Sequence, residues 1–395
     1  MKSDFDVRKT VAVIFTAFIS LCGIMTLLLS PRQVFGGLVR GYINTPEESS
    51  FFQKLGNSVK TFDGRVSEYF VFHDLSIHSY GGIQRVLNKS LINDTDKSYE
   101  VVKLKNGYLT FRQSGEGDLR PLKNYLIDFK KICDSSGSRL LFVNNLSKDT
   151  TNEKLIPDFY PYVYNSDFKQ IKSDLKNNGV NVLDFEDVVN EQNIDKFSLF
   201  FKTDHHWTPK TGLWVSRNIV KKINSSFGWK LDTKLLEEHN YITDSYPSSF
   251  LGTQGRRVGV LYAGADDFDI VIPDFDTDFT VEISDNNSTV RGDFCKTMIH
   301  KENITPDNLL NRDETAYDAY MGGNHALLRI TNHNIKNGKK ALFILNSYGC
   351  VVYPYLAVEF QHIDCIDIRG YADSVEDFVR KNSPDVVIYA IGGHQ

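Results

Sequence analysis

A histidine with an aspartate two residues before it suggests acid–base chemistry. The run Thr203–Pro209 reads TDHHWTP. In an extended segment, side chains two residues apart point the same way, so Asp204 and His206 face one side and His205 faces the other. A carboxylate beside an imidazole fixes its tautomer and stabilises the imidazolium that forms when the ring takes a proton. The pair therefore supplies two members of a nucleophilic triad and lacks the nucleophile.

Ser347 is the candidate nucleophile. It lies in the run Leu345-Asn346-Ser347-Tyr348-Gly349, between an apolar segment that predicts a buried strand and a segment that predicts a helix. A serine in this place is presented at the carboxyl edge of the sheet, where open α/β sheets have their sites. The start of a helix and free backbone N–H groups would also favour an oxyanion there.

A glycine-rich turn, Met321-Gly322-Gly323-Asn324-His325, offers a third element. Glycines allow a close approach of the backbone to a ligand, and Asn324 carries an amide that can donate to a developing oxyanion. A tight turn without a role in chemistry is the competing interpretation.

Two other interpretations of the TDHHWTP run are open. One is an Asp–His hydrogen bond that only supports the start of the following helix. The other is a metal site built on Asp204, His205 and His206, although no third and fourth ligands stand out elsewhere. The cysteines, which include no CxxC pair, do not have zinc-ligand spacing, so we expect no metal and no cofactor.

The elements that must position these residues alternate between strand and helix. Thr208 is placed to cap a helix that starts at Pro209 and runs to about Phe227. Short apolar strands separated by helices are typical of a parallel sheet covered on both faces. The predicted strands are RLLFVNNL, VNVLDF, ALFILN, HIDCIDI and DVVIYAI, and the predicted helices between them cover 118–135, 167–178, 354–360 and 374–381.

The chain begins with an apolar segment. Between Lys9 and Arg32 there is no charged residue, which predicts a transmembrane helix over 10–31. An uncleaved signal anchor is favoured over a cleaved signal peptide, because the segment is long and no A-x-A-like site follows it. Basic residues before the span favour a cytoplasmic tail over 1–9 and an extracytoplasmic remainder.

Three further regions follow the span. Residues 32–100 predict a stem with helical segments, because Phe62, Val66, Tyr69 and Phe70 form one helical stripe. Residues 101–395 form the α/β domain. Within it, 229–337 lose the helical pattern and contain β-like pieces, which predicts a β-rich insertion or subdomain.

Composition excludes several classes of protein. The 395 residues are 41% apolar and 24% charged, with a formal net charge of −5, which is ordinary for a folded chain and unlike a disordered one. The absence of a basic excess counts against nucleic acid as a partner.

Taken in order, these motifs resemble the DHHW family of SGNH-hydrolase-like proteins, which is related to the alginate O-acetylation proteins AlgJ and AlgX. The matching segments are FFKTDHHWTPKTGLW, MGGNHALLRIT, KKALFILNSYG, HIDCIDIRGY and the final PDVVIYAI. The resemblance implies a three-layer SGNH-like domain in which the order of the catalytic residues is permuted.

The resemblance implies a role for each matching residue. Ser347 corresponds to the nucleophile, His206 to the general base and acid, and Asp204 to its orienting partner. The residue before the serine is usually Asp in this family and is Asn346 here, a departure that leaves room for a degenerate site. The oxyanion or substrate-binding candidates are Asn324, Gly323, Gly349, Arg369, Tyr348 and Tyr371.

The implied activity is acetylation of a polysaccharide outside the membrane through an acyl-enzyme. The resemblance also implies a membrane-bound O-acyltransferase (MBOAT) partner that supplies the acetyl group. A carbohydrate acetyl esterase needs the same triad, and the sequence does not separate the two. A non-catalytic, membrane-anchored component that binds or assembles polysaccharide is the alternative from another class.

Overall fold

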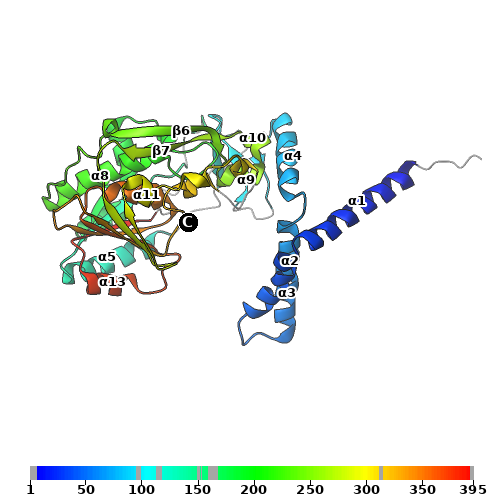
Figure 1. Cartoon of the computed structure of the whole chain (residues 1–395), viewed down its shortest axis with the longest axis horizontal. Coiled ribbons are helices and arrows are strands. Elements are labelled where there is room, and N and C mark those ends of the chain that lie inside the picture. The colour runs from blue at the N-terminus through cyan, green and yellow to red at the C-terminus, as the bar shows by residue number, and fades with distance from the viewer. Residues whose placement is uncertain are drawn as a thin grey trace, which may run out of the picture. The chain divides into compact units, whose positions relative to one another are not determined.

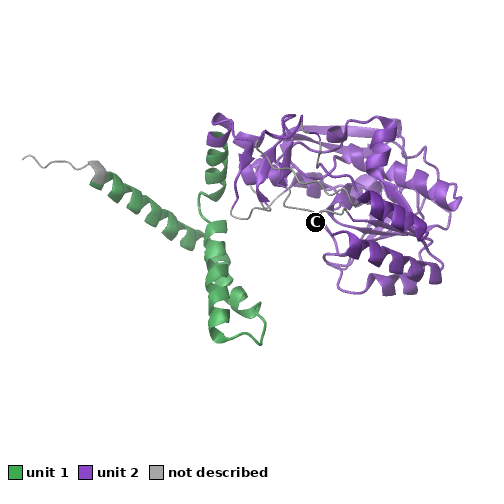
Figure 2. Ribbon diagram, turned by 180° about the vertical axis from the view of Figure 1, so that it is seen from behind, with its two compact units in different colours: residues 1–82 green, residues 83–395 purple. Residues whose placement is uncertain are grey.

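The computed structural model describes residues 7–94, 99–112, 118–148, 152, 154–158, 168–310 and 315–391. The chain divides into two compact units, residues 1–82 and 83–395, which Figure 2 colours separately. The candidate site residues lie in the second unit.

The first unit is helical. It contains α1 (Val7–Leu29), α2 (Pro31–Ile43), α3 (Phe51–Glu68) and the beginning of α4 (His73–Val86). Lys9–Leu29 has a mean hydropathy of 2.5 and is long enough to cross a bilayer, so it fits a single-pass anchor or a signal sequence. Ser50 and Gln53 form a reciprocal capping box that starts α3. Of the predicted stripe, α3 contains Phe62 and Val66, whereas Tyr69 is its C-cap and Phe70 lies beyond its end.

The second unit is built on an eight-stranded sheet in the order β5-β4-β13-β11-β12-β10-β8-β9. The first five strands of this order run parallel, and the last three are antiparallel to their neighbours. The predicted mostly parallel sheet is therefore confirmed. The strands are β4 (Arg139–Asn144), β5 (Asn181–Asp184), β8 (Phe279–Ile283), β9 (Ser288–Gly292), β10 (Leu327–Asn332), β11 (Lys340–Leu345), β12 (His362–Asp367) and β13 (Val386–Ala390).

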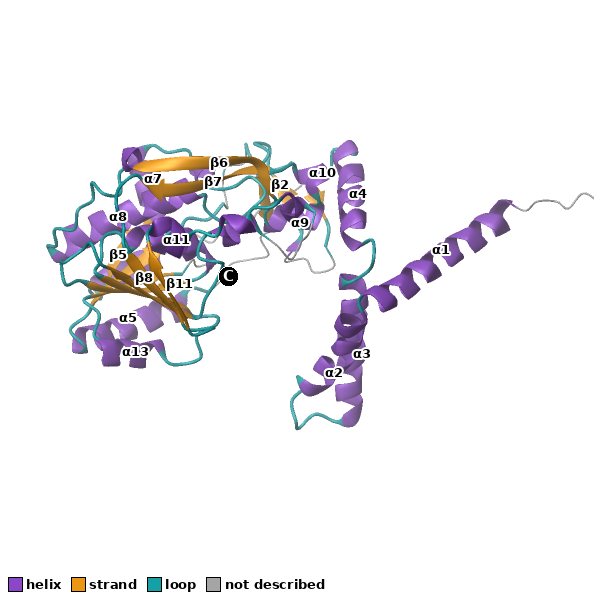
Figure 3. Cartoon of the chain, viewed as in Figure 1, coloured by secondary structure: helices purple, strands orange, loops and turns teal. Residues whose placement is uncertain are grey.

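Helices cover both faces of this sheet, as Figures 1 and 3 show. In β11, Leu342 and Ile344 point into one apolar cluster, whereas Phe343 and Leu345 point into the other. This alternation follows from the two-residue period of a strand and explains the continuous apolar sequence. One face carries α5 (Arg120–Ser135), α6 (Phe168–Asn177) and α13 (Val375–Asn382), and the other carries α7 (Phe185–Gln192), α8 (Pro209–Phe227), α11 (Phe294–Met298) and α12 (Tyr353–Leu356).

Residues 229–337 are rich in strands, and they also enlarge the main sheet. In β10, buried Leu328 and Ile330 alternate with exposed or half-exposed neighbours, and the strand pairs with β12 on one side and β8 on the other. The same region contains a separate hairpin of β6 (Tyr241–Phe250) and β7 (Asp266–Pro273), and two short helices, α9 (Thr253–Val258) and α10 (Val260–Ala263). A third, small sheet joins β1 (Leu91–Ile92), β2 (Val101–Lys103) and β3 (Leu109–Phe111).

Gly212 in α8 permits close packing against the segment that carries Ser347. A Cβ atom at Gly212 would lie 1.9 Å from the carbonyl oxygen of Val351, at the end of the 3₁₀ helix η7 (Ser347–Val351). Only a glycine therefore lets α8 approach η7 this closely.

We expect Gly212→Ala to lower the free energy of unfolding by about 1–3 kcal/mol, because overpacking outweighs the gain in helix propensity of about 1 kcal/mol. Differential scanning calorimetry of the full chain in detergent would measure the effect. Gly64→Ala in α3 is the matched control, since a Cβ there meets nothing within 4 Å and should not destabilise. Unchanged stability of Gly212→Ala would contradict the close packing.

Candidate active site

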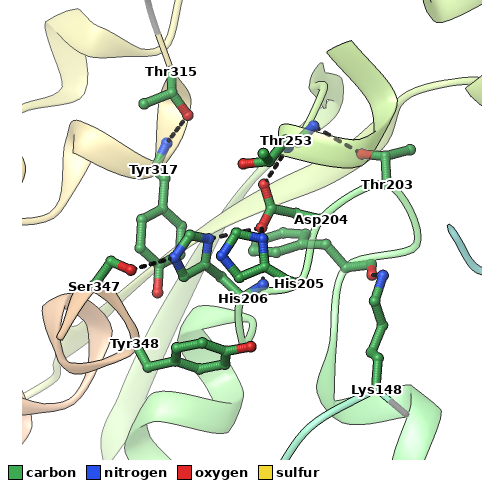
Figure 4. Close-up of polar contacts among 12 residues, drawn as sticks. Lys148, Thr203, Asp204, His205, His206, Thr253, Thr315, Tyr317, Ser347 and Tyr348 are labelled. Carbon is green, nitrogen blue, oxygen red and sulfur yellow. Dashed lines mark hydrogen bonds and ion pairs between the residues drawn. The ribbon is translucent and has the colours of Figure 1, made fainter. Parts of the chain in front are cut away.

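Ser347, His206 and Asp204 form one chain of hydrogen bonds (Figure 4). Ser347 Oγ lies 2.8 Å from His206 Nε2, and His206 Nδ1 lies 2.7 Å from Asp204 Oδ1. All three residues are buried. A carboxylate accepts from Nδ1–H, so Nε2 is the unprotonated nitrogen and accepts from the serine hydroxyl. This arrangement can deprotonate Ser347 when it attacks an acyl group.

The loop that carries Asp204 and His206 is closed at its base. Phe200 and Trp207 form an antiparallel bridge, and α8 begins directly after the loop. Thr208 caps this helix by accepting a hydrogen bond from the Thr211 N–H, and Pro209 is its first residue. The predicted start of the helix is confirmed, and it anchors the end of the loop next to His206.

The carboxylate of Asp204 is held on both oxygens. Oδ1 accepts from the backbone N–H of His206 at 2.8 Å in addition to its ring, and Oδ2 accepts from the N–H of Thr253 at 2.6 Å. A Cβ at Gly252 would lie 2.1 Å from Asp204 Cβ, so this approach requires glycine. Burial favours a raised pKa for Asp204, but the His206 and His205 rings and the hydrogen bonds from His206 hold the pKa well below its ordinary value.

Thr203 links the same loop to two other segments. Its hydroxyl donates to Asp266 Oδ2 and accepts from the N–H of Gly252 at 2.9 Å. Its carbonyl oxygen accepts from the N–H of Gly255. The Gly252–Gly255 segment therefore positions the carboxylate of Asp204. The sequence analysis missed it, because nothing in the run Gly252-Thr253-Gln254-Gly255 indicates which distant side chain its backbone contacts.

Ser347 is the first residue of η7, and one residue, Asn346, separates it from the end of β11. Asn346 caps this helix, because its Oδ1 accepts from the N–H of Tyr348. The N–H of a first helical residue has no acceptor within the helix, so the Ser347 N–H is suited to bind an oxyanion. The Gly349 N–H donates to the Asn346 carbonyl at 2.9 Å, and a Cβ at Gly349 would lie 2.6 Å from Leu345 Cδ1. Gly349 therefore permits packing against β11.

Asn324 lies next to η7 with its amide held in one orientation. Its Oδ1 accepts from Arg369 Nη2 at 3.0 Å and from the Cys350 thiol at 3.3 Å. Burial raises the pKa of Cys350 to about 12, so the thiol stays protonated and can donate. Arg369 is itself held by two hydrogen bonds to the carboxylate of Asp367 at the end of β12. With its oxygen occupied, Asn324 has its NH₂ group available as a donor.

Gly323 gives the turn its shape. Its φ of +105° lies in a region that L side chains rarely adopt, and a Cβ there would lie 3.2 Å from Asp318 Oδ1. Its N–H donates to the Tyr320 carbonyl at 3.2 Å, so this amide is already engaged.

The structure places the two predicted tyrosines differently. The ring of Tyr348 packs against His206 and Trp207, with centroid distances of 5.2 and 5.3 Å. The ring of Tyr371 packs against Phe378 of α13, within the apolar cluster on the other face of the sheet. Tyr348 is thus brought to the triad, and Tyr371 contacts a different part of the domain.

Tyr317 is a residue of the site that the sequence analysis missed. It belongs to the 3₁₀ helix η6 (Ala316–Ala319), and its ring stacks on the His206 ring at 4.5 Å with an interplanar angle of 26°. Its side chain limits the movement of the imidazole from one face. No pattern in the sequence separates Tyr317 from the other tyrosines of this region.

The metal interpretation conflicts with how His206 is used. The ligand atoms of Asp204, His205 and His206 lie within 4.8 Å of one another, as a metal site requires. Both nitrogens of His206 are already hydrogen-bonded, to Asp204 and to Ser347. A metal ion bound through His206 would break one of these bonds, so the observed geometry fits a triad better than a metal centre.

The chain is similar to known proteins in part of its sequence and in its fold. Residues 111–259 match the family model described as the SGNH hydrolase-like domain of acetyltransferase AlgX. No curated protein matches the chain. The match to the family model, together with the structural similarity to a DHHW family protein, confirms the resemblance predicted from the TDHHWTP run.

Three solved structures share the fold. A DHHW family protein from Eubacterium siraeum has 19% sequence identity and a TM-score of 0.56, covering 77% of this chain and 94% of its own. PatB1 from Bacillus cereus has 16% identity and a TM-score of 0.58, covering 77% of this chain and 96% of its own. PatB1 with a sulfonyl adduct has 15% identity, the same TM-score, and coverages of 77% and 95%.

We expect His205→Gln to make stability less sensitive to acid. Burial, the neighbouring His206 and nearby cationic side chains lower the pKa of His205 to about 3, from an ordinary value of 6.5. Between these values the unfolded chain binds a proton that the folded chain does not, so His205 makes the protein less stable as pH falls from 6.5 towards 3.

Calorimetry at pH 7 and pH 4.5 would give the change in the free energy of unfolding between these pH values. The test is whether this change is smaller in His205→Gln than in wild type. The comparison is needed because burial raises the pKa of Glu359 to about 8, which makes stability fall with rising pH and so acts in the opposite direction. An equal change in both proteins would show that His205 is not buried as a neutral ring.

Proposed function

We propose that this protein is an extracytoplasmic O-acetyltransferase that modifies a polysaccharide through an acyl-enzyme on Ser347. The observation that carries the proposal is the continuous hydrogen-bond chain from Ser347 through His206 to Asp204. The match to an acetyltransferase domain supports the choice of acyl group. The site residues have the roles that follow.

In the first half-reaction, Ser347 Oγ attacks the carbonyl carbon of an acetyl ester. His206 Nε2 takes the serine proton, and the anionic carboxylate of Asp204 stabilises the imidazolium that results. Collapse of the tetrahedral intermediate breaks the bond to the donor's oxygen, and His206 returns the proton to that leaving oxygen. The product is acetyl-Ser347 and a free hydroxyl on the donor.

In the second half-reaction, a sugar hydroxyl replaces water as the nucleophile. His206 takes its proton, the sugar oxygen forms a bond to the acetyl carbon, and the Ser347 oxygen leaves with the proton from His206. The His205 ring, whose side chain is 23% exposed, lies beside His206, with Phe111 and Tyr348 next to it. We propose that the acceptor sugar approaches over these three rings, because aromatic rings stack on the apolar faces of sugar rings.

The oxyanion of both intermediates is stabilised by the N–H of Ser347 and the side-chain NH₂ of Asn324. Arg369 is a positioning residue in this scheme, because it holds the amide oxygen of Asn324 and thereby directs the NH₂ group away from itself. The donors are fixed before the reaction, so no reorganisation is needed when charge develops.

The cellular arrangement is part of the same proposal. The apolar helix at the N-terminus anchors the chain in the bilayer with the catalytic unit outside the cytoplasm. Acetyl-CoA is not expected there, so a membrane-bound O-acyltransferase partner supplies the acetyl group across the membrane. The acceptor is a polysaccharide.

We expect Ser347→Ala to reduce acylation by p-nitrophenyl acetate by at least about a thousandfold, because the nucleophile is removed. Intact-protein mass spectrometry would detect the acetyl group, and phenylmethanesulfonyl fluoride should block the same residue. The control is Ser216→Ala, a buried serine whose hydroxyl donates only to backbone carbonyls, and it should acylate normally. Equal acylation of wild type and Ser347→Ala would support the non-catalytic alternative.

Transfer and hydrolysis are separated by adding an acceptor to the wild-type acylation reaction. A transferase should give an acetylated oligosaccharide and deplete acetyl-Ser347 faster as the acceptor concentration rises. Release of acetate at a rate independent of the oligosaccharide would identify an acetyl esterase.

We expect Asn324→Ala to slow acylation by about 100-fold with little change in stability, since one oxyanion donor is lost. Arg369→Met should give a smaller loss, because it frees the amide of Asn324 to rotate and does not remove it. Stopped-flow release of p-nitrophenol would measure both rates. If Arg369→Met reacts more slowly than Asn324→Ala, Arg369 does not act through Asn324.

A further inference from the structure

The hydroxyl of Tyr317 is buried at the triad without a partner. Tyr317 is 6% exposed, and its Oη makes no hydrogen bond to any residue that the structure describes. Buried hydroxyls in folded proteins are nearly always paired, because an unpaired one loses its hydrogen bonds to water and gains nothing in return. At an active site, the missing partner of such a hydroxyl can be a hydrogen-bond acceptor on the bound substrate.

The ring of Tyr317 lies against the imidazole of the triad. The ring stacks on His206, and Figure 4 shows its hydroxyl on the side of the imidazole where Ser347 lies. Burial, followed by the nearby Cys350 and Asp204, raises the pKa of Tyr317 well above its ordinary value. The phenol therefore stays protonated and acts as a donor.

We propose that the Tyr317 hydroxyl donates a hydrogen bond to the carbonyl oxygen of the acetyl group as that group is bound to Ser347. This inference rests on the proposed acyl-enzyme. In the addition step, Ser347 Oγ forms a bond to the acetyl carbon, the carbonyl π electrons move to its oxygen, and the serine proton goes to His206. Tyr317 keeps its own proton throughout and stabilises the oxyanion by hydrogen bonding.

The hydroxyl of Tyr317 is not needed for the contact with His206. The stacking contact with His206 needs only the ring, which phenylalanine would provide equally well. A donor that is unpaired before the substrate binds gains its hydrogen bond in the intermediate, which is how binding energy is directed to the transition state.

The test compares Tyr317→Phe with Tyr320→Phe in the full-length protein. Tyr320 is also buried, but its hydroxyl accepts from the Val271 N–H at 2.8 Å and bonds the Tyr355 hydroxyl at 3.0 Å. Acylation of Ser347 by p-nitrophenyl acetate is followed by stopped flow, and thermal unfolding is measured on the same samples. Both variants lose one buried hydroxyl and keep the ring.

We expect Tyr317→Phe to acylate roughly tenfold to a hundredfold more slowly, with an unchanged or raised Tm, because no existing hydrogen bond is lost. Tyr320→Phe should show the reverse, a lower Tm and the wild-type acylation rate. A structural role for the Tyr317 hydroxyl would instead lower the Tm of Tyr317→Phe.

Acylation of Tyr317→Phe at the wild-type rate would overturn the assignment of Tyr317. A different result is that Tyr317→Phe acylates slowly while the wild-type protein acylates normally but transfers no acetyl group to sugar. This result would support the assignment of Tyr317 and overturn only the transferase proposal. The two failures are therefore distinguishable in one set of measurements.

Discussion

A buried negative charge on Asp204 is the constraint on which the site depends. An ionised carboxylate inside a protein is costly unless it is paired and fully hydrogen-bonded. Asp204 meets this condition with the His206 ring, the His206 backbone and the Thr253 N–H. Removal of any of these partners would leave charge uncompensated. The absence of a side chain at Gly252 therefore serves the charge as well as the packing, because it lets the Thr253 N–H reach the carboxylate.

The parallel sheet positions the other residues of the site near the carboxylate of Asp204. Ser347 follows β11, and Asp367, which holds Arg369, ends the adjacent β12. The carboxyl ends of parallel strands lie at one edge, so the residues that follow them meet there although they are distant in sequence. Asn324 joins from the turn before β10, which pairs with the far side of β12. One sheet edge thus positions the nucleophile and the Arg369–Asn324 pair that we propose contributes an oxyanion donor.

The sequence predicts much of this fold and part of the site, for identifiable reasons. The strands of the parallel sheet and the start of α8 have local signals, namely apolar runs and a Thr-Pro cap, and the structure contains them. The pairing of Asp204 with His206 follows from their spacing. Thr253 and Tyr317 have no such signal, because their roles come from contacts between segments far apart along the chain. Tyr371 shows the converse, since the family resemblance suggested it as a site residue and its ring packs on α13.

The protonation states of the groups around Ser347 leave Asp204 as the ionised partner of His206. Burial keeps the Cys350 thiol, the Tyr317 phenol and the His205 imidazole neutral near pH 7, since their pKa values are shifted away from the charged forms. The ionised Asp204 beside them is hydrogen-bonded to His206. Its field therefore acts mainly on the ring that must gain and lose a proton in each half-reaction. Further ionised groups in contact with His206 would favour one protonation state and slow one of the two steps, whereas neutral donors can stabilise the oxyanion without shifting that balance.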